Sequence, residues 1–146
     1  MKKTLLLLLL AVSCNHVEEA PKSAFYYIDP LAMEYVLDFE KDIKGIGLEL
    51  QNNNKSFSVI IGRLPIRVAG IAIGMMNEEA VNVVLNIQIW DSLTKAEKKA
   101  LVYHELAHDV FGLEHGTCDI MRGSLRPITD KMVKELLDTL TKQQNK

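Results

Sequence analysis

The segment from Thr94 to Gly112 constrains the fold of this chain most strongly, because it specifies both ends of a long helix. Thr94 followed three residues later by Glu97 is a capping box, in which each side chain can bond the other residue's backbone N–H. Gly112 is suited to end the helix, since glycine readily adopts the left-handed conformation. The sequence therefore predicts a helix from Thr94 to about Phe111. Its core-facing stripe comprises Val102, Leu106, Val110 and Leu113.

Two histidines and a glutamate lie on this helix, in the order His104, Glu105, His108. A spacing of four residues puts both imidazoles on one face, about one turn apart, where they can share one Zn²⁺. Glu105 lies about 100° further around the helix, so it can reach a water on the ion rather than the ion itself. Such a carboxylate can act as a general base toward a water whose pKa the metal lowers toward about 7. We therefore predict a site with one zinc ion, with Glu105 as the catalytic base.

His115 is the predicted third ligand, because a turn at Gly112 can bring it back toward the metal. The window His104–His115 resembles the pattern H-E-x-x-H-x-x-G-x-x-H of the metzincin peptidases, which belong to the zincins. Here the glycine and the third histidine each lie one residue later, and a wider last helical turn can absorb the extra residue. The resemblance implies that Met121 corresponds to the methionine turn beneath the metal. A methionine in the core is the alternative.

Other residues remain open as the third ligand. Cys118 and Asp119 follow His115 closely, and Glu135 lies in the last predicted helix. Thiolates and carboxylates are both common zinc ligands. Asp109, directly after His108, is expected to be exposed to solvent rather than bound to the metal.

The rest of the domain predicts an α+β fold. It consists of a small mixed sheet packed on an N-terminal helix and on the metal-binding helix, with a C-terminal helix after Thr129. The N-terminal helix is predicted to begin with Asp29 as N-cap and Pro30 as first residue. This order of elements, over roughly residues 24–121, is similar to the zincin fold. The similarity implies that the last strand pairs with extended substrate. The predicted strands are Phe25–Ile28, Phe57–Ile61, Val68–Ile73 and Val81–Ile89.

The first residues are predicted to direct export of the protein and not to belong to the folded domain. Residues 1–13 combine a basic start with an apolar run far shorter than the ~20 residues of a membrane-spanning helix, which is typical of a signal peptide. The segment Leu10–Cys14 resembles the lipobox of bacterial lipoproteins. This implies a lipid on Cys14, a polar tether over residues 14–23 and a folded domain over residues 24–146. The protein is then expected on the membrane of the bacterial cell envelope, facing the periplasm or the outer surface.

Composition limits the classes of function. The chain has 146 residues, which suits one domain, and its net charge of −2 gives no basic surface for nucleic acid. The predicted function is a zinc metallopeptidase that hydrolyses peptide or protein substrates. Two alternatives stay open. One is a non-catalytic lipoprotein with a closed, four-ligand zinc site, and the other is a zinc amidase acting on cell-wall material.

Overall fold

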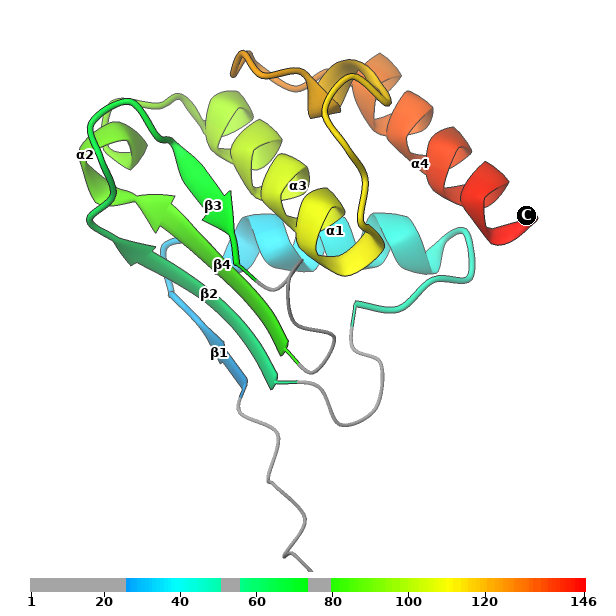
Figure 1. Cartoon of the computed structure of the whole chain (residues 1–146), viewed down its shortest axis with the longest axis horizontal. Coiled ribbons are helices and arrows are strands. Elements are labelled where there is room, and N and C mark those ends of the chain that lie inside the picture. The colour runs from blue at the N-terminus through cyan, green and yellow to red at the C-terminus, as the bar shows by residue number, and fades with distance from the viewer. Residues whose placement is uncertain (1–25, 51–55, 74–79) are drawn as a thin grey trace, which may run out of the picture.

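Figure 1 shows the computed structural model of the chain, which describes residues 26–50, 56–73 and 80–146. Within these residues the fold consists of a four-stranded mixed sheet and four α-helices, with a short 3-10 helix before the last one. The predicted α+β class is thus confirmed. The predicted signal peptide (1–13), the lipid-attachment residue Cys14 and the tether (14–23) lie outside the described residues.

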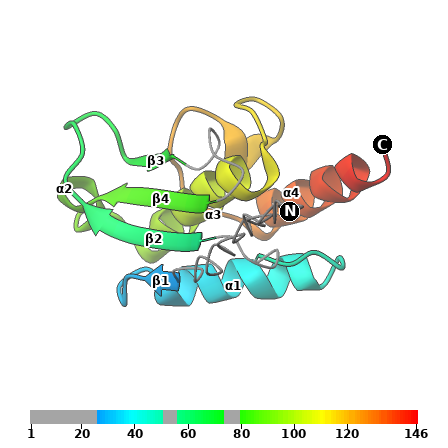
Figure 2. The same ribbon diagram turned by 60° about the horizontal axis from the view of Figure 1, so that its bottom comes forward.

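The sheet has the strand order β1-β2-β4-β3. The first three strands in this order run parallel, and β3 runs antiparallel to β4 at one edge. Figures 1 and 2 show β4 in the interior of the sheet, with β3 beside helix α3 (Lys95–Phe111). The strands are β1 (Tyr26–Ile28), β2 (Ser56–Gly62), β3 (Gly70–Ala72) and β4 (Ala80–Asn86).

One face of the sheet forms the core. The register pairs Phe57 with Val81 and Val59 with Val83, so the buried residues of β2 and β4 lie on the same face. They belong to one hydrophobic cluster with side chains from the helices. Helices cover this face, and α3 contacts both β4 and the edge strand β3.

The prediction of a single strand over Val81–Ile89 is wrong in its extent and in its position. β4 ends at Asn86, whose side chain accepts the N–H of Gln88 and caps the short helix α2 (Ile87–Trp90). β4 also lies between β2 and β3, so its backbone groups are used within the sheet. The strands at the two edges are β1 and β3, and β3 forms the edge beside α3.

Helix α1 (Met33–Lys44) begins later than predicted. Pro30 belongs to a turn, in which a side-chain oxygen of Asp29 accepts the N–H of Leu31 at 2.9 Å. Asp29 therefore stabilises the turn before the helix instead of capping the helix itself. Leu31, in the turn, is exposed, and the residues that α1 buries are Tyr35, Val36, Phe39 and Ile43.

Helix α3 (Lys95–Phe111) has both of its predicted ends. The Thr94 hydroxyl accepts the N–H of Glu97 at 3.3 Å, and the Glu97 carboxylate accepts the N–H of Thr94 at 2.9 Å. The capping box is thus confirmed. At the other end Gly112 has φ 63°, in the left-handed region. The buried face of the helix includes Val102, Tyr103 and Leu106.

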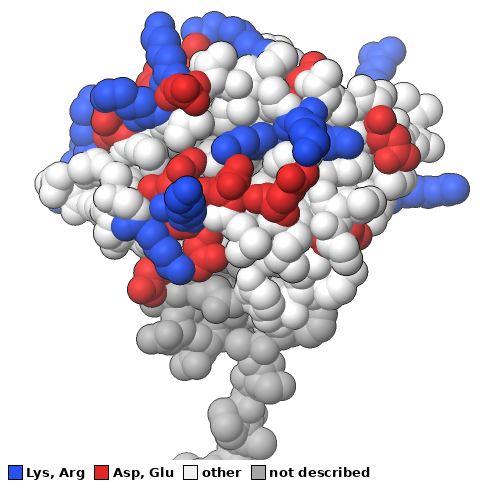
Figure 3. Space-filling model, turned by 180° about the vertical axis from the view of Figure 1, so that it is seen from behind, with Lys and Arg blue, Asp and Glu red and all other residues white. Residues whose placement is uncertain are grey.

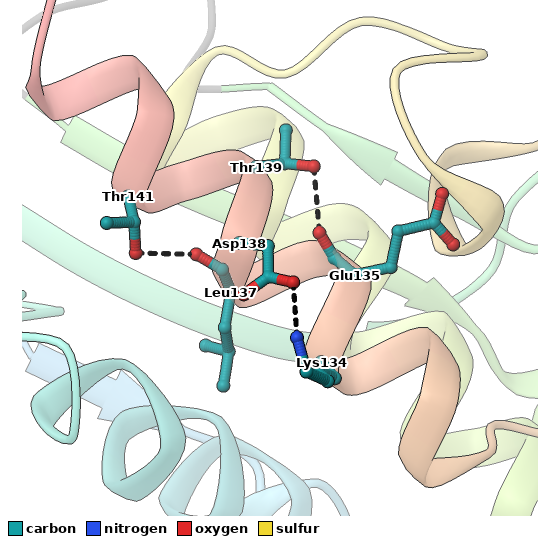
Figure 4. Close-up of polar contacts among 6 residues, drawn as sticks. All are labelled: Lys134, Glu135, Leu137, Asp138, Thr139 and Thr141. Carbon is teal, nitrogen blue, oxygen red and sulfur yellow. Dashed lines mark hydrogen bonds and ion pairs between the residues drawn. The ribbon is translucent and has the colours of Figure 1, made fainter.

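The C-terminal helix α4 (Asp130–Gln144) starts at the predicted cap, where the Thr129 hydroxyl accepts the N–H of Met132 at 3.3 Å. Figure 4 shows polar contacts along it, including the ion pair of Lys134 with Asp138 at 2.6 Å. The 3-10 helix η2 (Asp119–Met121) packs against both α3 and α4. The loop after α3 is therefore fixed on two sides.

Acidic and basic side chains are interspersed on the face seen in Figure 3, the one opposite to the view of Figure 1. The described residues form ion pairs such as Lys99 with Asp38, at 2.8 Å. This face therefore carries no extended patch of one sign. In the described part of the chain, no helix has the length and apolar character needed to cross a membrane.

Candidate metal centre

Three histidines come together at the end of α3. His104 and His108 lie one turn apart on the helix, and His115 lies in the loop that follows it. The Nε2 atom of His104 is 3.0 Å from that of His108 and 3.1 Å from that of His115. Within the described residues this is the group of side chains that could hold a metal ion. The predicted ligand set is thus brought together.

The extra residue between the second and third histidines is accommodated in the last turn of α3. The N–H of Leu113 bonds the carbonyl of Ala107, six residues back, at 3.2 Å. An ordinary α-helical bond spans four residues, so this last turn is wider. Gly116, with φ 85°, reverses the chain after His115, and its N–H donates to the carbonyl of Met121 at 2.9 Å. These bonds return His115 to the helix.

Backbone carbonyls orient the two helical histidines. The Nδ1 atom of His104 lies 2.7 Å from the carbonyl oxygen of Ile120, and Nδ1 of His108 bonds the carbonyl of Leu113. A carbonyl only accepts, so Nδ1 carries the hydrogen in both rings. In a neutral imidazole Nε2 then has a bare lone pair. The two Nε2 atoms therefore face each other at 3.0 Å with no hydrogen between them, an arrangement that a cation would stabilise.

Burial favours the neutral form of these two rings. It is the main cause that lowers the pKa of His104 and that of His108. The neighbouring histidines lower both further, while the bonds to the carbonyls of Ile120 and Leu113 act in the opposite direction. A neutral imidazole is the form that binds metals.

The spacing of the nitrogens fits a small tetrahedral ion. Bonds of about 2.0–2.1 Å from zinc to nitrogen, at tetrahedral angles, separate two ligand nitrogens by about 3.3 Å. The observed separations from His104 are 3.0 and 3.1 Å. A slight opening of the triad would therefore admit the ion, and second-shell carbonyls of the kind that metal sites use are already in position.

Glu105 lies beside the histidines, between α3 and β3. It is only 6% exposed, and burial raises the pKa of its carboxyl to about 7, with a contribution from the charge of Asp109. The backbone of β3 lies directly against it: a Cβ atom added to Gly70 would be 2.7 Å from Oε1 of Glu105. Only glycine at this position leaves room for the carboxylate.

Asp109 does not have the exposed position that we predicted. It is half-buried, and its Oδ2 atom accepts the N–H of Asn82 in β4 at 2.6 Å. The carboxylate thus ties the metal-binding helix to the sheet just where β3 ends. Asp109 is not a member of the histidine group.

The alternative third ligands lie elsewhere. Asp119 pairs with Arg122 at 2.7 Å, and Cys118 is a buried free thiol whose pKa is raised, chiefly by burial. The charge of Glu135, a residue drawn in Figure 4, also raises that pKa, so Glu135 is near Cys118. None of the three belongs to the histidine group. Met121 is fully buried in η2, directly after the residue whose carbonyl orients His104.

Two clefts meet at the histidines. One has a volume of about 290 Å³ and the other of about 440 Å³, and both reach His104, His115 and Glu105. Gly70 lines both, and Ile71 and Ala72 of the edge strand line the second. The site is therefore open to solvent and to a ligand on two sides.

Sequence reasoning missed several parts of this site. The carbonyls of Leu113 and Ile120 and the close approach of Gly70 depend on backbone geometry, which no motif records. Comparison with protein-family models, with curated proteins and with solved structures returned no match. The interpretation of the site therefore depends on its own geometry.

Proposed function

We propose that the protein is a zinc-dependent metallopeptidase of minimal zincin type, with His104, His108 and His115 as its zinc ligands. The observation that carries the proposal is the approach of the Nε2 atoms of His104 and His108 to 3.0 Å, each with a lone pair directed at the other. The Nδ1 atoms of the same rings bond backbone carbonyls. Three imidazoles and one open position are a typical set of ligands for catalytic zinc. A glutamate beside such a set is the second requirement of hydrolysis, and Glu105 meets it.

Zinc bound here would act as a Lewis acid that polarises the scissile carbonyl. It would also lower the pKa of a water bound to it toward about 7. Glu105 would accept the proton of the attacking water and then donate it to the leaving amine. The burial of Glu105 supports this assignment, because a partly desolvated carboxylate holds a proton more readily than an exposed one. Asp109 would hold α3 in register with the sheet.

β3 is the edge strand beside the histidines, and an extended peptide could join the sheet there. It lines the second cleft through Gly70, Ile71 and Ala72, together with all three histidines. An added strand would use backbone hydrogen bonds for its register, and the clefts would select its side chains. This role replaces the one predicted for Val81–Ile89.

A structural zinc site would need a fourth protein ligand, and among the described residues the group contains only three. The clefts on both sides of the histidines also favour an open, catalytic site.

The proposal includes attachment to the bacterial cell envelope through a lipid on Cys14, supported by the lipobox-like segment.

Metal analysis and chelation test the proposed function. Purified protein is expected to contain about one zinc ion per chain by mass spectrometry of its metals. It is also expected to cleave members of a mixed peptide library, detected as new peptide termini. A chelator should abolish cleavage, and added zinc should restore it. Protein that binds no metal in the presence of zinc, or cleavage that survives chelation, would contradict the proposal.

Substituting Gly70 with alanine is expected to lower kcat/KM by about 10- to 100-fold while zinc content stays unchanged. The added Cβ would displace the Glu105 carboxylate, since β3 is held by its pairing with β4, and small errors in the position of a catalytic group have effects of this size. Gly62→Ala is the matched control, because there the nearest atom is an ordinary contact at 3.6 Å. Equal activity of the two variants would show that hydrolysis does not depend on the position of Glu105.

A further inference from the structure

Arginines line one of the two clefts beside the histidines. The chain contains four arginines, and three of them line the cleft of about 290 Å³. No lysine of the described residues lines it. Arginine differs from lysine in presenting a planar fork that matches both oxygens of a carboxylate. The arginines of the cleft are Arg67, Arg122 and Arg126.

Two of these arginines are available to a ligand. Arg122 forms an ion pair with Asp119 at 2.7 Å. Arg67 and Arg126 are exposed, and neither forms an ion pair with an acidic group in the described ranges. The cleft is therefore lined by three guanidinium groups and two carboxylates, those of Asp119 and Glu105, and two of the guanidinium groups form no ion pair with described residues.

Both arginines lie on loops that are fixed by buried or main-chain bonds. The side-chain amide of Asn86, which is fully buried, donates to the carbonyls of Leu64, Pro65 and Val68 around Arg67. The loop of Arg126 is tied to the first turn of α3 by the N–H of Ile128, which donates to the carbonyl of Ala96 at 3.1 Å. The backbone positions of these arginines are therefore set in advance, which reduces the entropy lost on binding a ligand.

The second cleft has the opposite character. It is lined by Ile71 and Ala72 and by the carboxylate of Glu114, and no arginine or lysine of residues 26–50, 56–73 and 80–146 lines it. The two clefts share Gly70, His104, Glu105 and His115, so they meet at the metal centre. A peptide that passes the centre would meet basic groups on one side only.

We propose that this arginine-lined cleft selects peptides that carry a carboxylate on one side of the bond at the metal centre. The inference rests on the proposed function. The carboxylate can belong to an aspartate or glutamate side chain or to the C-terminus of the peptide, and both present the same two oxygens to a guanidinium.

Two assays test the proposal, one by cleavage and one by binding. In the first, a neutral peptide that the protein cleaves is resynthesised with single Asn→Asp changes on either side of the cleaved bond, and with its C-terminus free or amidated. In the second, the same peptides carry an uncharged dye, and their binding to zinc-loaded Glu105→Gln protein is measured by fluorescence anisotropy. If no peptide is cleaved, the binding assay uses a neutral peptide of the library and its own Asn→Asp variants.

The expected result is a preference for the acidic peptide, confined to changes on one side of the bond. Arg67→Gln and Arg126→Gln should each reduce this preference about three- to tenfold. This is the effect expected for an exposed ion pair in which a guanidinium binds both oxygens of a carboxylate. Arg126→Lys should retain part of it. At 1 M salt, where the Debye length is about 3 Å, the preference should largely disappear. Arg63→Gln is the matched control, since Arg63 is exposed and is the one arginine outside this cleft.

The outcomes separate this inference from the proposed function. Cleavage with no acidic preference, with preference on both sides, or with preference unchanged in the arginine variants would overturn the inference and leave the peptidase proposal standing. Arginine-dependent binding of acidic peptides without any cleavage would support the inference and contradict the peptidase proposal. Binding that is indifferent to charge in a protein that cleaves nothing would overturn both.

Discussion

Replacement of Glu105 by glutamine is expected to leave zinc bound and to reduce peptide hydrolysis by about 10²- to 10⁴-fold, the range typical of a lost general base. The amide has nearly the same size as the carboxylate, so the cleft keeps its shape, but the amide cannot take a proton from water. Glu105 is not a member of the histidine group, and the metal should therefore remain. Metal analysis and kcat/KM on one cleaved peptide measure the two effects separately.

Protein stability should not fall in this variant. The Glu105 side chain is buried and lies close enough to Asp109 for the charge of Asp109 to raise its pKa. A neutral amide removes that repulsion. Thermal unfolding is thus expected to show an unchanged or slightly higher midpoint, which excludes misfolding as the cause of lost activity.

Glu135→Gln is the matched control for this experiment. It makes the same chemical change at a glutamate outside the histidine group, and Glu135 was itself a candidate ligand. Zinc content and activity should both stay at the wild-type level. Full activity of Glu105→Gln would contradict the assignment of Glu105 as the catalytic base. Loss of zinc in Glu135→Gln would indicate that Glu135, and not His115, is the third ligand.

The parts of this molecule that could be predicted are those encoded by neighbouring residues. The capping box of Thr94 and Glu97 and the left-handed Gly112 involve contacts a few residues long, and both are confirmed. The convergence of the three histidines follows from a helix of known period and one turn after it. A window of twelve residues therefore contained most of the geometry of the metal centre.

Long-range topology could not be predicted in the same way. Alternating apolar residues identify β4 as a strand, but they do not tell whether a strand lies inside the sheet or at its edge. β3 has only three residues, yet it pairs with β4 at one edge of the sheet and brings Gly70 against Glu105. Asp109 was misjudged for the same reason, since its partner in β4 is 27 residues away in sequence.

Substitution of His108 by alanine is expected to reduce zinc content from about one ion per chain to nearly none. Two ligands would remain, and one of them, His115, lies on an exposed turn rather than on the helix. The lost Nδ1 contact to the carbonyl of Leu113 would also loosen the wide turn that returns His115 to the site. Even second-shell losses weaken metal binding about 10- to 100-fold, so loss of a ligand should exceed that effect.

Thermal unfolding with and without zinc provides a second measurement of the same loss. Zinc at 100 times its dissociation constant would stabilise the wild-type protein by about 2.7 kcal/mol, and the alanine variant should not gain this increment. Cys118→Ser and His16→Ala are the controls. Cys118 is a buried thiol that was a candidate ligand, and His16 is the histidine outside the twelve-residue window. Both controls should bind zinc as the wild-type protein does. If His108→Ala kept its zinc while Cys118→Ser lost it, the metal would be held by a different set of residues, and the function proposed from the histidine triad would have to be abandoned.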